Sequence, residues 1–268
     1  MAQHSIDDII TKFRPISLEQ MSGIKLMNRT DTKFVTSVPL LYQLLELAHS
    51  QYFVQDIDGV RISPYYTAYF DTADYAMYTM HQNGHTGRQK VRIRSYVSSN
   101  LNFLEVKTKN NHGRTRKKRV AVEDFDPVNP RHDIVFRRQN EQFVAYDDFL
   151  RKHLMYAPDT LLELLENRFD RITLVNEART ERLTIDTNLR FHNLANDRRH
   201  DLTGLAIIEL KRDGLVPSPI LELLRQLRIK PHGFSKYCMG QAFTNPNLKT
   251  NRFKERLRSI ERILAQAQ

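Results

Sequence analysis

Apolar and polar residues alternate with a period of two over residues 90–119, which read KVRIRSYVSSNLNFLEVKTKNNHGRTRKKR. Two turn-rich tracts, at residues 98–100 and 110–113, divide this region into three segments. Successive side chains of a strand point to opposite faces of its sheet. The pattern therefore predicts three short strands joined by hairpin turns, with one apolar face and one polar face.

The polar face of these three strands is predominantly basic. Its predicted positions are Lys90, Arg92, Arg94, Glu105, Lys107, Lys109, Arg114, Arg116 and Lys118. A half-exposed antiparallel sheet also alternates polar and apolar residues, but it normally mixes charges, because like charges opposite each other are destabilising. One carboxylate among so many cations predicts a bound polyanion. For residues 114–119, a solvated basic hairpin is the alternative interpretation.

The rest of the chain predicts five more strands and a set of helices. The strands are expected at residues 28–35, 65–71, 169–177, 182–189 and 205–211. Helical spacing and caps predict helices after Ser37 and at residues 72–82, 143–154, 159–165, 219–227, 236–243 and 251–266. Eight antiparallel strands are enough to close a barrel. We therefore predict an α+β fold in which an eight-stranded antiparallel β-barrel has helices packed outside it.

Composition narrows the possible partners. The chain has 268 residues, a net charge of +10 at pH 7 and a pI near 9.7. Its length suits one large domain or two, and its charge favours nucleic acid, an anionic membrane or phosphorylated small molecules. Cys238 is the only cysteine, so we expect no internal disulfide. We see no signal peptide and no apolar run that spans a membrane, and we expect a cytoplasmic protein.

Seven short motifs, in this order along the chain, resemble the polyphosphate polymerase domain of the vacuolar transporter chaperone (VTC) complex. They are RTDTKF, YFDT, KVRIRSY, FLEVKTK, RLTID, IIELK and FSKYCMG. Each motif alone is weak, but their ordered combination is specific. The VTC domain is one of the triphosphate tunnel metalloenzymes, with the CYTH phosphatases and cyclases. The resemblance implies one domain over residues 12–245. The sequence of residues 246–268 predicts a basic amphipathic helix; packing on the domain is the simpler interpretation, and docking on a membrane or partner is the alternative.

The resemblance implies a metal-dependent polymerase that transfers the γ-phosphoryl group of ATP to a growing polyphosphate chain inside a basic tunnel. The expected catalytic positions are Lys33, Arg92, Arg94, Lys107 and Lys236. The expected phosphate- and nucleotide-binding positions are Arg29, Lys90, Lys118, Arg171 and Arg182. Glu209 matches the carboxylate that holds Mn²⁺ or Mg²⁺. Lys117 or Arg119 takes the place of Lys118 if the register of the third strand differs.

These residue types suit phosphoryl transfer, which needs positioning and neutralisation of spreading negative charge. Arginine binds phosphate oxygens in pairs, and lysine adds a point charge. Asp31 and Glu105 are expected to orient the arginines by ion pairs. Glu209 could instead pair with Lys211 or a facing arginine. His81 is assigned to a loop and not to a metal site.

Some features depart from the family pattern or bear on whether the chain belongs with the polymerases or with the hydrolases and cyclases. Gly233 stands where relatives often have another lysine. The first strand begins Arg29-Thr30-Asp31-Thr32-Lys33, whereas hydrolases and cyclases of the superfamily usually have E-x-E-x-K, which favours the polymerase branch. The sensing domain and membrane helices of the eukaryotic complexes are not recognised, which leaves a separate membrane partner open. No glycine-rich phosphate loop is present.

Two other functions remain open. The same tunnel could act as a tripolyphosphatase or nucleoside triphosphatase. The chain could also be a non-catalytic polyphosphate-binding module, whose affinity would depend strongly on salt and not on metal. We find no zinc-finger cysteines and no aromatic RNA-binding signature, so no specific nucleic-acid partner is expected.

Overall fold

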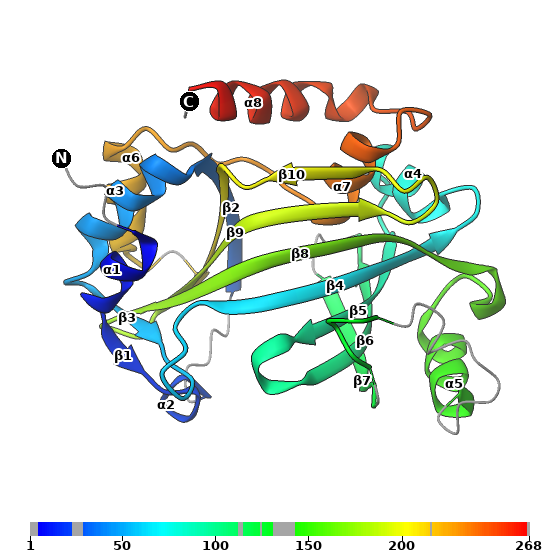
Figure 1. Cartoon of the computed structure of the whole chain (residues 1–268), viewed down its shortest axis with the longest axis horizontal. Coiled ribbons are helices and arrows are strands. Elements are labelled where there is room, and N and C mark those ends of the chain that lie inside the picture. Colours follow the sequence, from blue (N-terminus) through cyan, green and yellow to red (C-terminus); the bar gives the residue numbers. More distant parts are fainter. Residues whose placement is uncertain are drawn as a thin grey trace.

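The computed structural model of the chain describes residues 5–22, 29–111, 115–123, 125–130, 143–214 and 216–266, except for the side chains of residues 22 and 29. The strands are β1 (Arg14–Ile16), β2 (Arg29–Ser37), β3 (Tyr52–Gln55), β4 (Ser63–Thr72), β5 (Gln89–Tyr96), β6 (Leu101–Lys109), β7 (Thr115–Ala121), β8 (Leu161–Asn176), β9 (Glu181–Asn193), β10 (Arg199–Leu202) and β11 (Leu205–Asp213). The helices are α1 (Ile6–Thr11), α2 (Leu18–Ser22), α3 (Val38–Ala48), α4 (Ala76–Gln82), α5 (Phe143–His153), α6 (Pro219–Gln226), α7 (Lys236–Thr244) and α8 (Lys254–Ala265). Figure 1 shows their arrangement.

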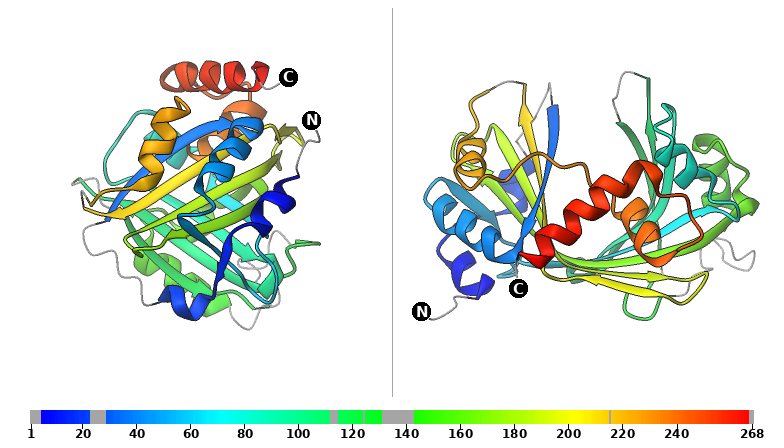
Figure 2. Two further views of the ribbon diagram at one scale, coloured as in Figure 1. Left: turned by 90° about the vertical axis from the view of Figure 1, so that its left-hand side faces the viewer. Right: turned by 90° about the horizontal axis from the view of Figure 1, so that it is seen from above.

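All eleven strands belong to one sheet, whose main path runs β2-β11-β9-β8-β4-β5-β6-β7. Neighbours on this path pair antiparallel. Off the path, β10 pairs with β9, and β3 pairs with β8 and with the parallel strand β1. In the right-hand view of Figure 2 the sheet bends into a U, with β2 and β11 on one arm and β5, β6 and β7 on the other. We call the inside of this U the trough.

The α+β class and the antiparallel sheet are as predicted, but the eight-stranded barrel is wrong. The sheet has eleven strands, and its path ends at β2 and β7. A barrel needs hydrogen bonds between its first and last strands, and in the described part of the chain no ladder joins these two. Phe34 of β2 instead bridges to Pro231, and β7 exposes the basic residues 116–119. Charged side chains are a common protection for an open sheet edge.

One predicted helix is part of a strand. The leucines at residues 161–165 have helical spacing, but a short 3-10 helix (Pro158–Thr160) leads directly into β8. Ten residues of β4 pair with β8 from Leu161 onward, and this pairing outweighs the local pattern. Strands β1, β3 and β10 were not predicted, because three or four residues are too few to display a period of two.

The three largest apolar cores lie on the two faces of the sheet. Outside the first arm, α1, α3 and α6 pack on residues such as Ile208 of β11. Outside the second arm, α5 packs on residues such as Ile93 of β5. Inside the trough, α7 packs on β8, β9 and β10, and its Met239 belongs to the same core as Tyr69 of β4 and Ile207 of β11. Helices were predicted only outside the sheet, so the position of α7 corrects that prediction.

Helix α8 lies across the top of the molecule in Figure 1 and between the two arms in the right-hand view of Figure 2. Its Ile260 is completely buried, and Leu257, Ile263 and Leu264 pack toward the same core as α7. The helix contacts β2 and β11. Within the described residues, no helix is both long enough and apolar enough to cross a membrane.

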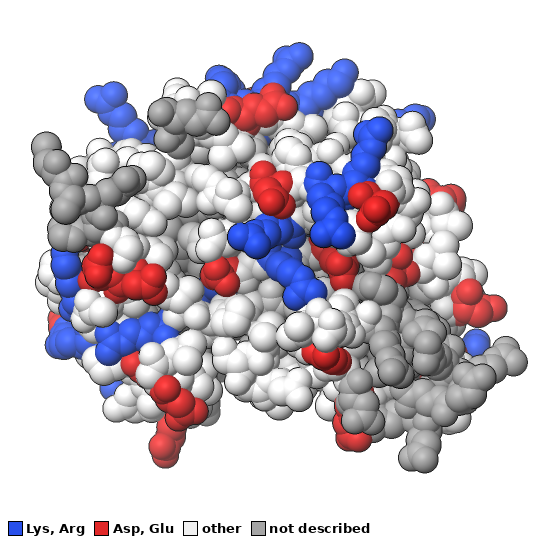
Figure 3. All heavy atoms as spheres, viewed as in Figure 1, with Lys and Arg blue, Asp and Glu red and all other residues white. Residues whose placement is uncertain are grey.

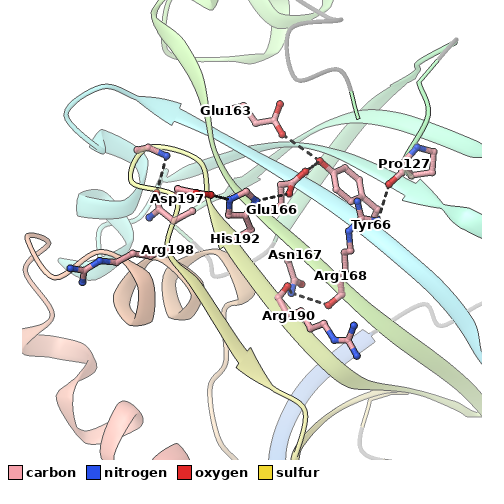
Figure 4. Close-up of polar contacts among 12 residues, drawn as sticks. Tyr66, Pro127, Glu163, Glu166, Asn167, Arg168, Arg190, His192, Asp197 and Arg198 are labelled. Carbon is pink, nitrogen blue, oxygen red and sulfur yellow. Dashed lines mark hydrogen bonds and ion pairs between the residues drawn. The ribbon is translucent and has the colours of Figure 1, made fainter. Parts of the chain in front are cut away.

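The outer face of β4, β8 and β9 carries a polar network (Figure 4). Tyr66 donates a hydrogen bond of 2.5 Å to Glu166, and the two ring nitrogens of His192 lie 3.2 Å from Glu166 and 2.6 Å from Asp197. Arg168 lies over the Tyr66 ring, 4.7 Å from its centroid. Figure 3 shows that basic and acidic side chains are intermixed on this face of the molecule. Charge on this outer face is therefore locally balanced.

We predict that Gly240→Val destabilises the protein. A Cβ atom at this position would lie 2.6 Å from side-chain atoms of Leu165 and Phe191, both almost completely buried. Replacing a helical glycine with valine gains less than about 1 kcal/mol of helix propensity, but overpacking a core costs about 1–3 kcal/mol. Denaturant unfolding should therefore show a lower free energy of unfolding. Ala242→Val, on the same helix at a half-exposed position, is the control; equal stability of the two variants would contradict this packing.

Candidate functional site

A cavity of about 340 Å³ lies in the trough, bounded by both arms of the sheet and by the first residues of α7. Its described lining contains ten basic residues and three carboxylates. The basic residues are Lys33, Arg88, Lys90, Arg92, Arg94, Lys107, Lys109, Arg171, Lys211 and Lys236. The carboxylates are Asp31, Asp186 and Glu209. In contrast to the mixed face in Figure 3, this lining has a strong excess of positive charge, which suits a polyanion.

Eight of the eleven predicted site residues line this cavity. They are Lys33, Lys90, Arg92, Arg94, Lys107, Arg171, Lys236 and Glu209. They come from β2, β5, β6, β8, α7 and β11, so the topology gathers into one space residues that are up to 203 positions apart in the sequence.

Lys118 lies on the wrong face of its strand for the predicted role. It pairs with Val106 of β6, whereas Lys117 pairs with Lys107 and Arg119 pairs with Glu105. Lys117 and Arg119 therefore share the face of the cavity residues, which is the alternative considered for this strand. A shift of one residue exchanges the two faces of a strand, and the turn before β7 does not reveal its length in the sequence.

Arg182 and Arg29 are the other two exceptions. Arg182 shares a face of β9 with Asp186, but it is not among the described lining residues, and its Nη2 donates to the carbonyl oxygen of Met21 at 3.3 Å. Burial lowers the pKa of Arg182. Arg29 is the first residue of β2, and its side chain lies outside the described residues. The binding roles of both arginines stay predictions.

Asp186 anchors two of the cavity cations, and the sequence reasoning missed it as a site residue although it ends the RLTID motif. Arg171 binds it in a bidentate way, with Nε–Oδ1 and Nη2–Oδ2 distances of 2.6 and 2.8 Å. Lys236 of α7 also donates to Oδ2. Burial alone would raise the pKa of Asp186, but Arg171 and Lys236 hold it well below its ordinary value. This carboxylate thus ties α7 to the sheet.

Glu105 orients Arg92, as predicted. Arg92 donates from Nε and Nη2 to the same oxygen of Glu105, at 2.8 and 2.6 Å. Lys117 lies 3.3 Å from the other oxygen. Burial opposes ionisation of Glu105, but these cations, Arg92 above all, lower its pKa to about 2. The carboxylate therefore stays charged and fixes the guanidinium.

Glu209 lies between two lysines. Its oxygens are 3.7 Å from the Nζ atom of Lys33 and 3.4 Å from that of Lys211. Burial would raise the pKa of Glu209, but these lysines lower it to about 2. The described residues contain no group of three or more His, Cys, Asp or Glu side chains that could hold a metal. Since Mg²⁺ and similar ions often use one or two carboxylates with waters and phosphate oxygens, Glu209 fits a cation that binds together with a phosphorylated ligand.

Several cavity cations have lowered pKa values. Arg92, burial and Arg94 lower the pKa of Lys107 to about 5. Burial is the main cause for Lys90 and Lys236, both lowered to about 8, and for Arg94, lowered to about 10. Without an anion, the cavity therefore holds less than its formal charge. A bound polyanion would favour the protonated lysines and raise these values again.

His81 is a lining residue that the sequence reasoning assigned to a loop. It lies in the last turn of α4 and faces the cavity. Its Nδ1 atom is buried and has no hydrogen-bond partner within the described part of the chain. Burial and Lys90 lower its pKa to about 2, so the ring is neutral. No motif contains His81, and its position follows only from the packing of α4 against β4 and α7.

The sheet, its helices and the cavity define an α+β domain with a strongly basic cavity between the two arms of its sheet. The family model described as the VTC domain matches residues 28–245. The chain therefore belongs to the VTC domain family. A comparison with curated proteins finds no match.

Solved structures with similar folds include two candidate cyclases. One, from Vibrio parahaemolyticus, is described as an adenylate cyclase; it has 10% sequence identity and a TM-score of 0.44, with 81% of this chain and 99% of that chain covered. The other, from Hippeastrum, is described as an adenylyl cyclase with a dominant triphosphatase activity; it has 16% identity and a TM-score of 0.47, with 83% and 99% covered. A protein from Pyrococcus horikoshii has 12% identity and a TM-score of 0.41, with 80% and 98% covered.

We predict that tripolyphosphate binding takes up a proton through Lys107. At pH 7.5 this lysine is mostly neutral in the free protein, because its pKa is about 5, and the polyanion returns it toward the usual lysine value of about 10.4. Affinity should therefore fall as pH rises from about 6 to 9, by up to about tenfold per unit. Titration calorimetry in buffers of different ionisation enthalpy, without metal, counts the protons.

Lys107→Met is the control for this measurement, because protons that the ligand itself releases or binds are common to both proteins. The variant should take up about one proton fewer than the wild type. Equal proton uptake by the two proteins would show that Lys107 does not gain a proton on binding and would contradict the prediction.

Proposed function

We propose that the protein is a metal-dependent polyphosphate polymerase, which transfers the γ-phosphoryl group of ATP to the end of a growing polyphosphate chain. The observation that carries this proposal is the cavity of a VTC domain whose ten basic residues face three carboxylates. Such an excess of partly buried positive charge favours the binding of a highly charged anion that offsets it. ATP and polyphosphate both supply that anion. The proposal places the reaction in the cytoplasm, where ATP is available.

In this proposal, cations of the second arm, of β8 and of α7 surround the phosphate chain. Arg92 and Arg94 of β5 offer planar guanidinium groups, which bind pairs of phosphate oxygens. Arg171 faces them from β8, and Lys107 and Lys236 add point charges. This arrangement would hold donor and acceptor phosphates in line and offset the negative charge that spreads in the transition state.

The proposed reaction needs no covalent intermediate with the protein. A terminal oxygen of polyphosphate forms a bond to the γ-phosphorus, and the bond from that phosphorus to the β–γ bridging oxygen breaks. ADP leaves with that oxygen, and the chain grows by one phosphate. Mn²⁺ or Mg²⁺ bound at Glu209 would offset charge on the phosphate oxygens.

Two carboxylates and the histidine of the cavity would give hydrolysis little help. Attack by water benefits from a general base with a pKa near the working pH. Glu209 has a pKa of about 2, the pKa of Asp186 is also far below its usual value, and His81 is held neutral with a pKa of about 2. All three are therefore weak bases. A phosphate end is already anionic and needs no base to attack.

The decisive experiment incubates the pure protein with ATP and either Mn²⁺ or Mg²⁺, with and without a short polyphosphate primer. Gel electrophoresis measures chain length, and ADP and free phosphate are quantified in parallel. We expect long chains together with one ADP per phosphate added. Free phosphate without chains would instead identify a hydrolase, and binding without turnover would identify a polyphosphate-binding module.

We predict that Glu209→Gln lowers metal-dependent turnover by about 100-fold or more, since it removes the proposed metal ligand while keeping the shape of the side chain. Thermal unfolding should show that the variant is folded. Glu222→Gln is the matched control, because Glu222 lies on α6 and pairs with the exposed Arg225. Wild-type turnover in Glu209→Gln would remove this residue from the metal site.

A further inference from the structure

We propose that Tyr65 and Phe169 are positioning residues of the cavity, and that their stacked rings hold Arg94, Arg171 and Lys236 in place for the phosphate chain. This inference rests on the proposed function, since it concerns the same phosphate-binding site. It assigns a role to two aromatic residues that are neither charged nor part of the motifs that carry the phosphate-binding cations.

The two rings form a rigid pair beneath the cations. Tyr65 of β4 and Phe169 of β8 are partners across the strands. Their ring centroids are 5.1 Å apart and their planes differ by 19°, so the rings are stacked. Both residues are buried, with 9% and 2% of their surface exposed. Tyr96 of β5 supports Tyr65 from the other side, with a centroid distance of 5.0 Å.

Three cations from three different elements lie against this pair. Lys236 of α7 places its Nζ atom 4.3 Å from the centroid of Phe169. The guanidinium carbon of Arg171 is 4.8 Å from the centroid of Tyr65 and 5.3 Å from that of Phe169. The guanidinium carbon of Arg94 is 5.9 Å from the centroid of Tyr65. All of these distances are within the range of cation–π attraction.

Arg94 shows why an aromatic ring suits this position better than a carboxylate does. Its Nε atom is buried and has no hydrogen-bond partner among the described residues. Burial, followed by Arg92 and Arg171, lowers its pKa to about 10. A carboxylate would hold this guanidinium but would also compete with phosphate for it. The face of an aromatic ring attracts a cation without neutralising it, so the charge remains available to the ligand.

The same reasoning applies to Arg171 and Lys236, which share the single carboxylate of Asp186. Asp186 offsets one positive charge of the two. The ring of Phe169 contacts both cations and replaces part of the water that burial has removed. The aromatic pair therefore compensates for desolvation, while the net positive charge of the cavity is kept.

The test changes the electrostatics of the Phe169 ring and not its shape. Site-specific incorporation places phenylalanine with one, two or three ring fluorines at position 169, since each fluorine withdraws electron density from the ring face. Calorimetry with tripolyphosphate, at fixed pH and without metal, should show affinity falling stepwise, to about a tenth of the wild-type value with three fluorines. Thermal unfolding should be nearly constant across the series.

Conventional variants give a second readout. Phe169→Leu should lose affinity for tripolyphosphate, while Phe169→Tyr, which keeps the aromatic face, should bind within about threefold of the wild type. Affinity that does not change across the fluorine series, in a wild-type protein that binds tripolyphosphate, would overturn the aromatic role alone. A wild-type protein that does not bind tripolyphosphate would overturn both this inference and the proposed function.

Discussion

Repulsion among the cations of one cavity is the constraint on which the rest of this structure depends. Two unit charges 4 Å apart interact by about 4 kcal/mol when the effective dielectric constant is about 20, and ten basic residues line this cavity. Asp186, Glu105 and Glu209 each pair with two of the surrounding cations. Arg92 is the largest cause that lowers the pKa of Lys107 to about 5. These pairs therefore relieve only part of the repulsion, and a bound anion would relieve more of it.

Burial of apolar side chains elsewhere in the fold offsets the free-energy cost of gathering these cations. The outer faces of the two arms bury separate apolar cores under α1, α3 and α6 and under α5, and a third core forms inside the trough around α7. Alternation along each strand makes this division possible: in β5, Val91 and Ile93 point to the outer core, and Arg92 and Arg94 point to the cavity. The apolar cores on the outer face of the sheet therefore fix the backbone that carries the basic side chains on the inner face.

Much of this arrangement could be predicted from the sequence, wherever a local pattern carries the information. The parity of β5 and β6 located Lys90, Arg92, Arg94 and Lys107 correctly, because both strands are long and alternate regularly. The ordered motifs predicted the VTC domain family, and the match of the family model to residues 28–245 confirms that prediction.

The failures occur where long-range contacts decide the structure. Lys118 faces away from the cavity because the length of a turn sets the register of β7. Residues 161–165 form a strand because β4 pairs with them. Open edges at β2 and β7, and the position of α7 inside the trough, follow from tertiary packing, and no local pattern announces them.

An open sheet also changes what determines the width of the cavity. In a closed barrel, backbone hydrogen bonds around the whole circumference fix the diameter. In this protein the arms are joined through β9, β8 and β4, and α7 packs between the arms on β8 and β9, where Lys236 binds Asp186. Substitutions on one nine-residue helix can therefore widen or narrow the passage without breaking any strand pair, which gives evolution a simple way to adapt the domain to anions of different size.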